Sequence, residues 1–358
     1  MKVDLIRFFF RILLKSKRKK KTDINIDNIQ NILVVSNTAI GDTLFSTPAI
    51  RLIKDSYPSK KIIALMNPKN ISLFAHNPSI DEYLEYNGKW SAFWSIRRKL
   101  IKKKIDIAFV FHSNEPQITP LLVLSKIGII LKSPNSMNEF RHLHFNAPIE
   151  ANRSQHFINT RLELLNYINI FEKSYKMELF LPREEDIDIF DQNYINVGFQ
   201  IKGSTKSRNW KNEYWIDLAY KILRKYRDSR IYLLGSIKDS RECRLIKEQV
   251  PDERVADLSG NYDIVGAANI IKELSVLVTV DTGPLHIAAA LKVPTVAFSV
   301  AGKSKQSNPV DESVRHVFIE KPETCIPCLD KKCKNAFCMD QIKVNDVMNE
   351  LTKILLSK

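Results

Sequence analysis

Short apolar runs alternate with helical patterns along the first half of the chain, and this alternation restricts the fold more than any other feature. Residues 31–35 (NILVV), 61–66 (KIIALM) and 105–111 (IDIAFVF) each predict a strand. Residues 44–55, which follow the first of these, carry apolar side chains at helical spacing. Because strands that alternate with helices form βαβ units, this half predicts an α/β domain with a parallel sheet.

The second half repeats the pattern after a helix predicted over residues 156–170 and a polar stretch, PREEDIDIFD, at 182–191. A length of 358 residues also fits about two domains. The predicted strands of the second half cover residues 195–200, 230–234, 274–280 and 295–299, and the predicted helices cover 213–227, 285–291 and 341–356. The expected organisation is an N-terminal extension (1–30), two Rossmann-like domains (31–185 and 190–340) and a C-terminal helix (341–358).

The formal net charge of the chain is +15. A positive field favours polyanionic partners, such as nucleic acid, nucleotide phosphates or an anionic membrane surface. The alternative is a basic composition without functional meaning. Aromatic and basic residues are interleaved mainly at residues 90–98 (WSAFWSIRR), which argues against stacking on single-stranded nucleic acid, so we expect no nucleic-acid partner.

The N-terminus combines an apolar run, residues 6–14 (IRFFFRILL), with a basic run, residues 15–21 (KSKRKKK). A signal peptide has the opposite order, and no stretch reaches the roughly 18–20 apolar residues that span a bilayer. One helix face would carry the apolar side chains of Phe8, Phe9, Ile12 and Leu13. This predicts an interfacial membrane anchor with a polybasic flank. The alternative is a helix packed on the protein body beside a solvated charge run.

Four of the five cysteines cluster near the C-terminus, at Cys325, Cys328, Cys333 and Cys338. Because no export signal precedes the chain's first domain, disulfide bonds are not expected. The C-x2-C-x4-C-x4-C spacing permits a tetrahedral zinc site, although its loops are shorter than those of most zinc modules. A structural zinc ion therefore remains a hypothesis.

The loop SNTAIGDT, residues 36–43, lies between the first predicted strand and its helix. Gly41 would let the backbone turn tightly. Asp42 would lie at or near the N-terminus of the helix, where a carboxylate can bond exposed backbone N–H groups. In the functional interpretation, the same carboxylate faces a cleft at the carboxyl edge of the sheet.

A second loop, DTGPLH, follows the predicted strand 274–280. The N–H groups of Thr282 and Gly283, at the start of a helix, would form an anion site suited to a diphosphate. Pro284 fits the first helical turn, and His286 in that turn could add a hydrogen-bond donor.

A third loop, KGSTKSRNW, residues 202–210, follows the first strand of the second half. It holds Lys202, Lys206 and Arg208 among small polar residues, a composition that can bind phosphates through charge-assisted hydrogen bonds. The alternative is a solvated basic loop.

These segments together resemble the heptosyltransferases of glycosyltransferase family 9. The similar segments are NILVVSNTAIGDTLFSTPAIRLIKDSYP, GSTKSRNWKNEYWIDLAYKI, DLSGNYDIVGAANIIKELSVLVTVDTGPLHIAAALKVPTVAFSV and CIPCLDKKCKNAFCMDQI, and the resemblance extends over roughly residues 31–355. It implies a GT-B fold, in which two Rossmann-like domains place parallel sheets around a central cleft and the last helix crosses back to the first domain. Thr38 and the extension through Lys21 depart from the family pattern.

The resemblance also implies a function and its residues. The first domain would bind the acceptor and the second the nucleotide sugar. The activity would be an inverting transfer, of heptose from ADP-heptose, to a lipopolysaccharide-core or related glycolipid acceptor. The implied catalytic residue is Asp42, and the implied donor-binding residues are Lys206, Arg208, Asp239, Asp281, Thr282, Gly283 and His286.

In this interpretation, Asp42 removes the proton from the attacking acceptor hydroxyl, and the basic groups and N–H donors stabilise the leaving diphosphate. No DxD carboxylate pair lies near these loops, so no divalent cofactor is expected. The enzyme would be cytoplasmic and peripheral on the inner face of the cytoplasmic membrane. Two alternatives remain, a sugar-nucleotide epimerase of similar fold and a non-catalytic protein that binds polyanions.

Overall fold

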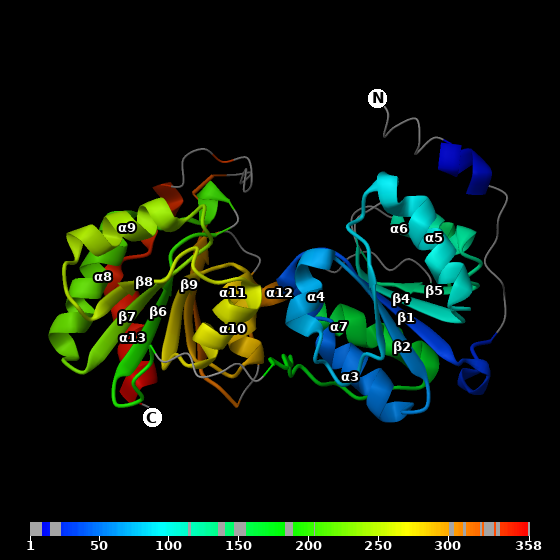
Figure 1. Cartoon of the computed structure of the whole chain (residues 1–358), viewed down its shortest axis with the longest axis horizontal. Helices are drawn as coiled ribbons and strands as arrows, with labels where there is room; N and C mark the ends of the chain where they lie inside the picture. Colours follow the sequence, from blue (N-terminus) through cyan, green and yellow to red (C-terminus); the bar gives the residue numbers. More distant parts are fainter. Residues whose placement is uncertain are drawn as a thin grey trace. The chain divides into compact units, whose positions relative to one another are not determined.

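A computed structural model of the chain describes residues 9–14, 23–113, 116–134, 140–146, 155–182, 189–203, 205–300, 304–310, 313–322, 324–325, 333 and 337–356. The chain folds into two compact units, Met1–Phe180 and Leu181–Lys358 (Figure 1). The boundary lies beside the polar stretch at 182–191 that separates the two predicted strand–helix patterns.

The first unit is built on a five-stranded sheet in the order β3-β2-β1-β4-β5, and all its strand pairs are parallel. Only the first residue of the central strand β1 is not buried, because helices cover both faces of a parallel sheet. The strands are β1 (Asn31–Ser36), β2 (Lys61–Met66), β3 (Glu82–Glu85), β4 (Ile107–His112) and β5 (Ile129–Lys132).

The helices of this unit lie on both sides of the sheet, with α5 beside α6 and α3 beside α7 (Figure 1). They are α2 (Ile40–Leu44), α3 (Thr47–Ser56), α4 (Pro68–Phe74), α5 (Phe93–Lys102), α6 (Ile118–Leu124) and α7 (Phe157–Leu162). Leu33 and Val35 of β1 belong to the same apolar cluster as Ile96 and Leu100 of α5, which places them on the α5 side of the sheet.

The second unit is built on a six-stranded sheet in the order β11-β10-β9-β6-β7-β8, again with parallel pairs throughout. Its strands are β6 (Ile195–Gln200), β7 (Ser229–Leu234), β8 (Val255–Asp257), β9 (Val276–Val280), β10 (Thr295–Val300) and β11 (His316–Lys321). Its helices are α8 (Asn212–Lys225), α9 (Ser240–Gln249), α10 (Ile264–Lys272), α11 (Gly283–Ala290), α12 (Ser304–Ser307) and α13 (Val344–Leu356).

Four aromatic rings, those of Phe199, Trp210, Trp215 and Phe298, pack together in the core of the second unit. Trp215 of α8 is fully buried, and its ring lies 5.0 Å from that of Phe199 and 5.7 Å from that of Phe298. Trp210 packs edge-on against Trp215, and its indole Nε1 donates to the backbone oxygen of Ile342 at 2.9 Å. This hydrogen bond joins the loop after β6 to the segment that leads into α13.

The C-terminal helix α13 packs against the sheet of the second unit. That it also crosses back to the first domain stays a prediction. Val347, Leu351 and Ile354 are almost fully buried in the cluster that includes Trp215. Their spacing forms one apolar stripe on the helix, which contacts α8 and the strands β9 to β11. This stripe is buried by the second sheet.

All seven strands expected from apolar runs are present, with ends shifted by at most a few residues. Four further strands, β3, β5, β8 and β11, were not predicted, and each lies at an edge of its sheet. Edge strands have one neighbour and are shorter or more polar, as in β3 (EYLE) and β8 (VAD). Their sequences therefore lack the continuous apolar run that indicates a buried strand.

The helix predicted over residues 156–170 divides into two elements. The α-helix α7 ends at Leu162, and a 3-10 helix, Glu163–Ile168, follows it. Asn169 ends this segment with φ of 61°, a left-handed conformation that asparagine tolerates better than most residues.

The position of α13 predicts the effect of two leucine substitutions on the same helix. Leu351 is fully buried and Leu356 is 77% exposed. We expect Leu351→Ala to lower the free energy of unfolding of the second unit by about 2–5 kcal/mol, and Leu356→Ala to change it by less than about 0.5 kcal/mol. Hydrogen exchange on the full chain should show faster exchange in β9 and β10 for Leu351→Ala. Equally fast exchange in β1 would contradict the placement of α13.

Candidate functional site

Asp42 lies in the first turn of α2, directly after β1. The N-cap residue of this helix is Ala39, so Asp42 does not occupy the capping position. Its Oδ2 atom instead accepts a hydrogen bond from Thr38 Oγ1 at 3.0 Å, and its side chain is 23% exposed. The carboxylate is therefore held by a neighbouring hydroxyl and remains accessible at the carboxyl edge of the first sheet.

Gly41 does not form the expected tight turn. It is the second residue of α2, has a helical backbone and is buried.

A buried arginine, Arg161, contacts Asp42. Arg161 of α7 is 1% exposed, and its guanidinium donates to Ser46 Oγ at 3.0 Å and to the backbone oxygens of Phe157 and Asp42 at 2.6 and 3.2 Å. Its Nη2 atom also lies 3.8 Å from Asp42 Oδ1. Burial lowers the pKa of Arg161 to about 10 and the charge of Asp42 opposes this, so the guanidinium is positive at neutral pH.

His112, the last residue of β4, completes the surroundings of Asp42. Its Nδ1 atom lies 2.6 Å from Thr38 Oγ1 and 3.5 Å from Asp42 Oδ2. Burial lowers the pKa of His112; Asp42 opposes this shift, whereas Arg161 and Lys132 add to it. The imidazole is therefore predominantly neutral at pH 7.

Neither Arg161 nor His112 was found by sequence reasoning. Arg161 is 119 residues from Asp42 along the chain and lies in an ordinary amphipathic helix, so no local signal marks it. His112 had a usable signal, because it directly follows the predicted strand 105–111 and the carboxyl ends of parallel strands gather at one edge of a sheet.

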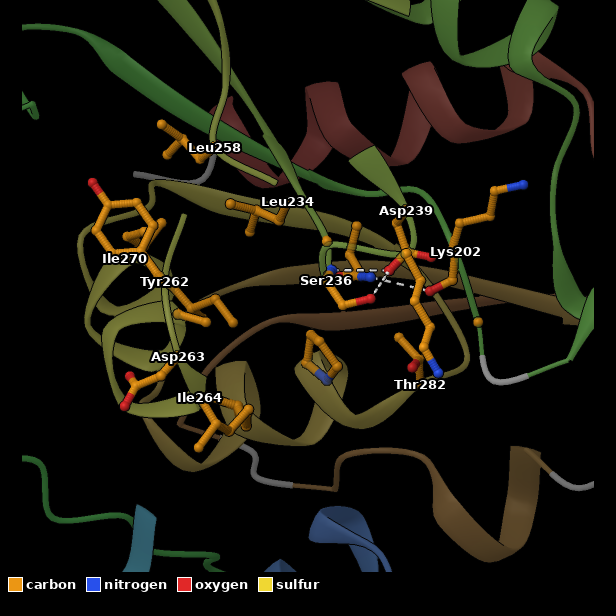
Figure 2. A pocket seen from close by; sticks show the side chains of 18 residues that line it. Lys202, Leu234, Ser236, Asp239, Leu258, Tyr262, Asp263, Ile264, Ile270 and Thr282 are labelled. Atoms are coloured by element: carbon orange, nitrogen blue, oxygen red, sulfur yellow. Dashed lines mark hydrogen bonds between the residues drawn. The ribbon is translucent and has the colours of Figure 1, made fainter. Parts of the chain in front are cut away.

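A cavity of about 550 Å³ lies at the carboxyl ends of β6 and β7 in the second unit (Figure 2). This volume is within the roughly 300–1,000 Å³ typical of small-molecule sites. The lining residues are Gln200, Lys202, Gly203, Leu234, Gly235, Ser236, Lys238, Asp239, Leu258, Tyr262, Asp263, Ile264, Ala267, Ile270, Ile271, Thr282, Pro284 and Ile287.

Apolar side chains gather toward one end of this cavity, with the carboxylate of Asp263 among them (Figure 2). Leu258, Tyr262 and Ile264 lie toward one end, and Lys202, Asp239 and Thr282 lie toward the other (Figure 2). An apolar slot beside a polar and charged end suits a ligand with a flat ring at one end and anionic groups at the other.

Asp239 lies in this cavity at the N-cap position of α9. Its Oδ2 atom accepts from the backbone N–H and the hydroxyl of Ser236, at 2.9 and 2.7 Å. A Cβ atom on Gly235 would lie 2.8 Å from the Cβ of Asp239, so a side chain at Gly235 would displace this carboxylate. The turn after β7 therefore depends on glycine to hold Asp239 in the cavity.

Lys202 also lines the cavity and is paired there. Its Nζ atom lies 3.1 Å from Glu242 Oε1 of α9. Burial acts to raise the pKa of Glu242, but the hydrogen bond and charge of Lys202 outweigh it and lower the pKa overall. The Glu242 carboxylate is therefore ionised at neutral pH.

Helix α11 begins at Gly283, with Thr282 at the N-cap and Pro284 in the first turn, as predicted. Thr282 and Pro284 line the cavity. Asp281, just before the N-cap, is bound to Arg208 Nη1 through its Oδ2 at 2.9 Å. The basic loop after β6 and the loop after β9 are thus joined beside the cavity.

Other predicted donor residues lie outside the cavity lining. Asp281, Gly283, Arg208 and His286 are not among the lining residues, and His286 is only 6% exposed within α11. The backbone of Lys206 belongs to a short 3-10 helix, Lys206–Arg208, and its side chain lies outside the described residues.

The cysteine cluster provides no support for zinc. No group of three or more His, Cys, Asp or Glu residues that could hold a metal ion occurs in the part of the chain that the structure describes. Cys325 is exposed, and Cys333 and Cys338 are partly buried. Cys328 lies outside the described residues.

Comparison with known proteins places these features in a family. The sequence profile described as glycosyltransferase family 9 (heptosyltransferase) matches residues 94–338. A curated relative, lipooligosaccharide heptosyltransferase 2 of Campylobacter jejuni subsp. jejuni, is 23% identical over 328 residues, which cover 89% of this chain and 96% of the relative.

Solved structures have the same fold. The glycosyl transferase family 9 structure from Veillonella parvula has a TM-score of 0.80 at 18% identity, covering 94% of this chain and 100% of that one. The E. coli heptosyltransferase WaaC with ADP has a TM-score of 0.69 at 15% identity, covering 91% of this chain and 100% of the other. The two parallel α/β units are those of the GT-B fold.

The sequence match covers well over half of the chain, and the fold agrees with it along nearly the whole length. The chain therefore belongs to glycosyltransferase family 9, the heptosyltransferases of lipopolysaccharide core synthesis, and is a glycosyltransferase.

Proposed function

We propose that the enzyme transfers heptose from ADP-heptose to a lipopolysaccharide-core or related glycolipid acceptor, with inversion at the anomeric carbon. The observation that carries this proposal is the environment of Asp42, a part-exposed carboxylate held by Thr38 and backed by the buried charge of Arg161. Membership in family 9 favours transfer over the epimerase and the non-catalytic binding protein considered above.

In the proposed reaction, Asp42 accepts the proton of the acceptor hydroxyl as its oxygen attacks the anomeric carbon. The bond between that carbon and the diphosphate oxygen breaks, and ADP leaves with the electron pair. A single displacement of this kind inverts the configuration. The anomeric centre carries partial positive charge in the transition state, as in glycoside hydrolysis.

The second unit would bind the donor. The apolar end of the cavity suits the adenine ring, and Asp239 would contact the ribose. The diphosphate would lie near Lys202 and the backbone N–H groups at the start of α11, with Arg208, Asp281 and His286 positioning that turn. These cationic and N–H groups would stabilise the leaving diphosphate, so we propose that no divalent cofactor is required.

Replacement of Asp42 tests the proposed base. Asp42→Asn should lower turnover by roughly 10²- to 10⁴-fold, because the amide cannot accept the proton, while ADP affinity and thermal stability stay near wild type. Turnover is measured as transfer from ADP-heptose to a soluble core acceptor. A folded Asp42→Asn enzyme with wild-type turnover would exclude Asp42 as the base.

Nucleotide binding tests the donor cavity. At a concentration about 100 times its Kd, ADP should stabilise the enzyme by roughly 2.7 kcal/mol, and GDP, UDP and dTDP should stabilise it less. Asp239→Asn should weaken ADP binding roughly 10-fold, because a charge-assisted hydrogen bond is lost. The control is Asp217→Asn on α8, a carboxylate 51% exposed and outside the cavity. Stronger stabilisation by UDP, or unchanged ADP binding by Asp239→Asn, would contradict this assignment.

We further propose that the enzyme acts peripherally at the inner face of the cytoplasmic membrane. The short helix at residues 9–14 supports this, because one of its faces is buried against the first unit and the other is exposed. Phe10 and Leu14 are buried in the core of the first unit, where the Phe10 ring stacks on Trp90. Phe9, Ile12 and Leu13 remain 57%, 60% and 40% exposed. The basic run 15–21 lies outside the described residues.

Nearby charge supports an anionic surface as the partner. Helix α5, which contributes Phe93 to the packing around Phe10, exposes Trp94, Arg98, Lys99 and Lys102. Exposed apolar and basic side chains together give the two signals that stable peripheral binding needs. Among the described helices, none is long and apolar enough to cross a bilayer.

Vesicle sedimentation tests this proposal without removing the buried side chains. The variant Phe9→Gln/Ile12→Gln/Leu13→Gln should lose most binding to vesicles of phosphatidylglycerol and phosphatidylethanolamine, and salt should weaken wild-type binding. Phe171→Gln/Leu245→Gln, at two exposed positions elsewhere, is the control and should bind as wild type. Equal binding by wild type and the triple variant would refute membrane docking through this helix.

A further inference from the structure

Two polar side chains of the first unit lie beside one oxygen of the Asp42 carboxylate. Thr38 follows β1, His112 ends β4, and Asp42 lies in α2. Thr38 Oγ1 lies 3.0 Å from Asp42 Oδ2 and 2.6 Å from His112 Nδ1. The backbone oxygen of Thr38 also accepts from Asn70 Nδ2 of α4 at 3.0 Å, so the position of this threonine is set by the fold.

Proton counting restricts how these three groups bond. A hydroxyl has one proton and can donate once, and an ionised carboxylate can only accept. Both short contacts of Thr38 are satisfied together when His112 carries its proton on Nδ1. His112 then donates to Thr38 Oγ1, and Thr38 donates to Asp42 Oδ2. A neutral imidazole can carry its single proton on Nδ1, so this arrangement does not require a charged His112.

We propose that Thr38 and His112 are positioning residues for Asp42, which they hold by a hydrogen-bonded chain in the orientation needed to accept the proton of the acceptor hydroxyl. This inference rests on the proposed role of Asp42 as the base. The opposite oxygen, Oδ1, lies 3.8 Å from Arg161 Nη2. The carboxylate is thus constrained on both sides by groups from separate elements.

Through these hydrogen bonds, the protonation state of His112 affects how kcat depends on pH. The charged groups that face the imidazole are Asp42, Arg161 and Lys132. When His112 gains a second proton at low pH, the imidazolium 3.5 Å from Asp42 Oδ2 becomes an ion-pair partner and makes the carboxylate a weaker base. Because the pKa of His112 is lowered, this loss of activity begins below the range of an ordinary histidine.

Replacement of Thr38 tests the proposed hydrogen bonds to Asp42 directly. Thr38→Val keeps the shape of the side chain and removes the hydroxyl, so kcat should fall on the order of 10-fold while KM for the donor stays within about twofold. Thr38→Ser should restore most of kcat. The control is Thr43→Val, whose hydroxyl bonds the backbone oxygens of Ser36 and Ala39 rather than Asp42, and its kcat per folded molecule should stay near wild type.

Combined substitutions and pH profiles separate this inference from the proposed base. Thr38→Val should have no further effect on the residual rate of Asp42→Asn, and His112→Gln should weaken the acid-side fall in kcat. The inference is overturned if Asp42→Asn is inactive but Thr38→Val has wild-type kcat. It is also overturned if Thr43→Val loses as much kcat as Thr38→Val, or if His112→Gln keeps the wild-type pH profile. Full activity of Asp42→Asn would instead reject the proposed base itself.

Discussion

Parallel strand pairing is the constraint on which both units of this enzyme depend. All described strand pairs in the two sheets are parallel, so every crossover returns the chain to the same edge of its sheet. The loops that follow the strands therefore gather at the carboxyl edges. Asp42 follows β1, His112 ends β4, and the cavity of the second unit surrounds the ends of β6 and β7. Within each unit, the topology therefore brings such groups to one edge of the sheet before any side-chain interaction acts.

The site in the first unit then depends on a buried charge. Removing a guanidinium from water is unfavourable unless its donors are bonded, and Arg161 satisfies this requirement with Ser46, Phe157 and the backbone of Asp42. The same bonds join α7 to the start of α2. One interaction thus stabilises the packing of two helices and places a fixed positive charge beside the proposed base. The arrangement links local stability to the geometry of catalysis.

In the proposed function, the second unit binds a ligand that is apolar at one end and anionic at the other. Its cavity has aliphatic walls beside Tyr262 and a polar end with Lys202 and Thr282. The polar side chains there are already ordered by bonds such as those between Asp239 and Ser236. Because these groups are ordered before the ligand arrives, less conformational entropy is lost on binding.

The sequence by itself determined the α/β class, the seven well-buried strands and the loops that carry Asp42, Thr282 and Pro284. These features follow from local signals: continuous apolar runs, turn residues and a proline in a first helical turn. The edge strands were not predicted, because a strand that pairs on only one side does not need a continuous apolar run.

Only the tertiary structure decided what surrounds these loops. It placed Arg161 and His112 beside Asp42, although they are far apart along the chain. It excluded the buried His286 from the lining of the cavity and packed α13 on the second sheet. The physical reason is that such contacts depend on which faces of distant elements are buried against one another, and a pattern of neighbouring residues carries no information about that choice.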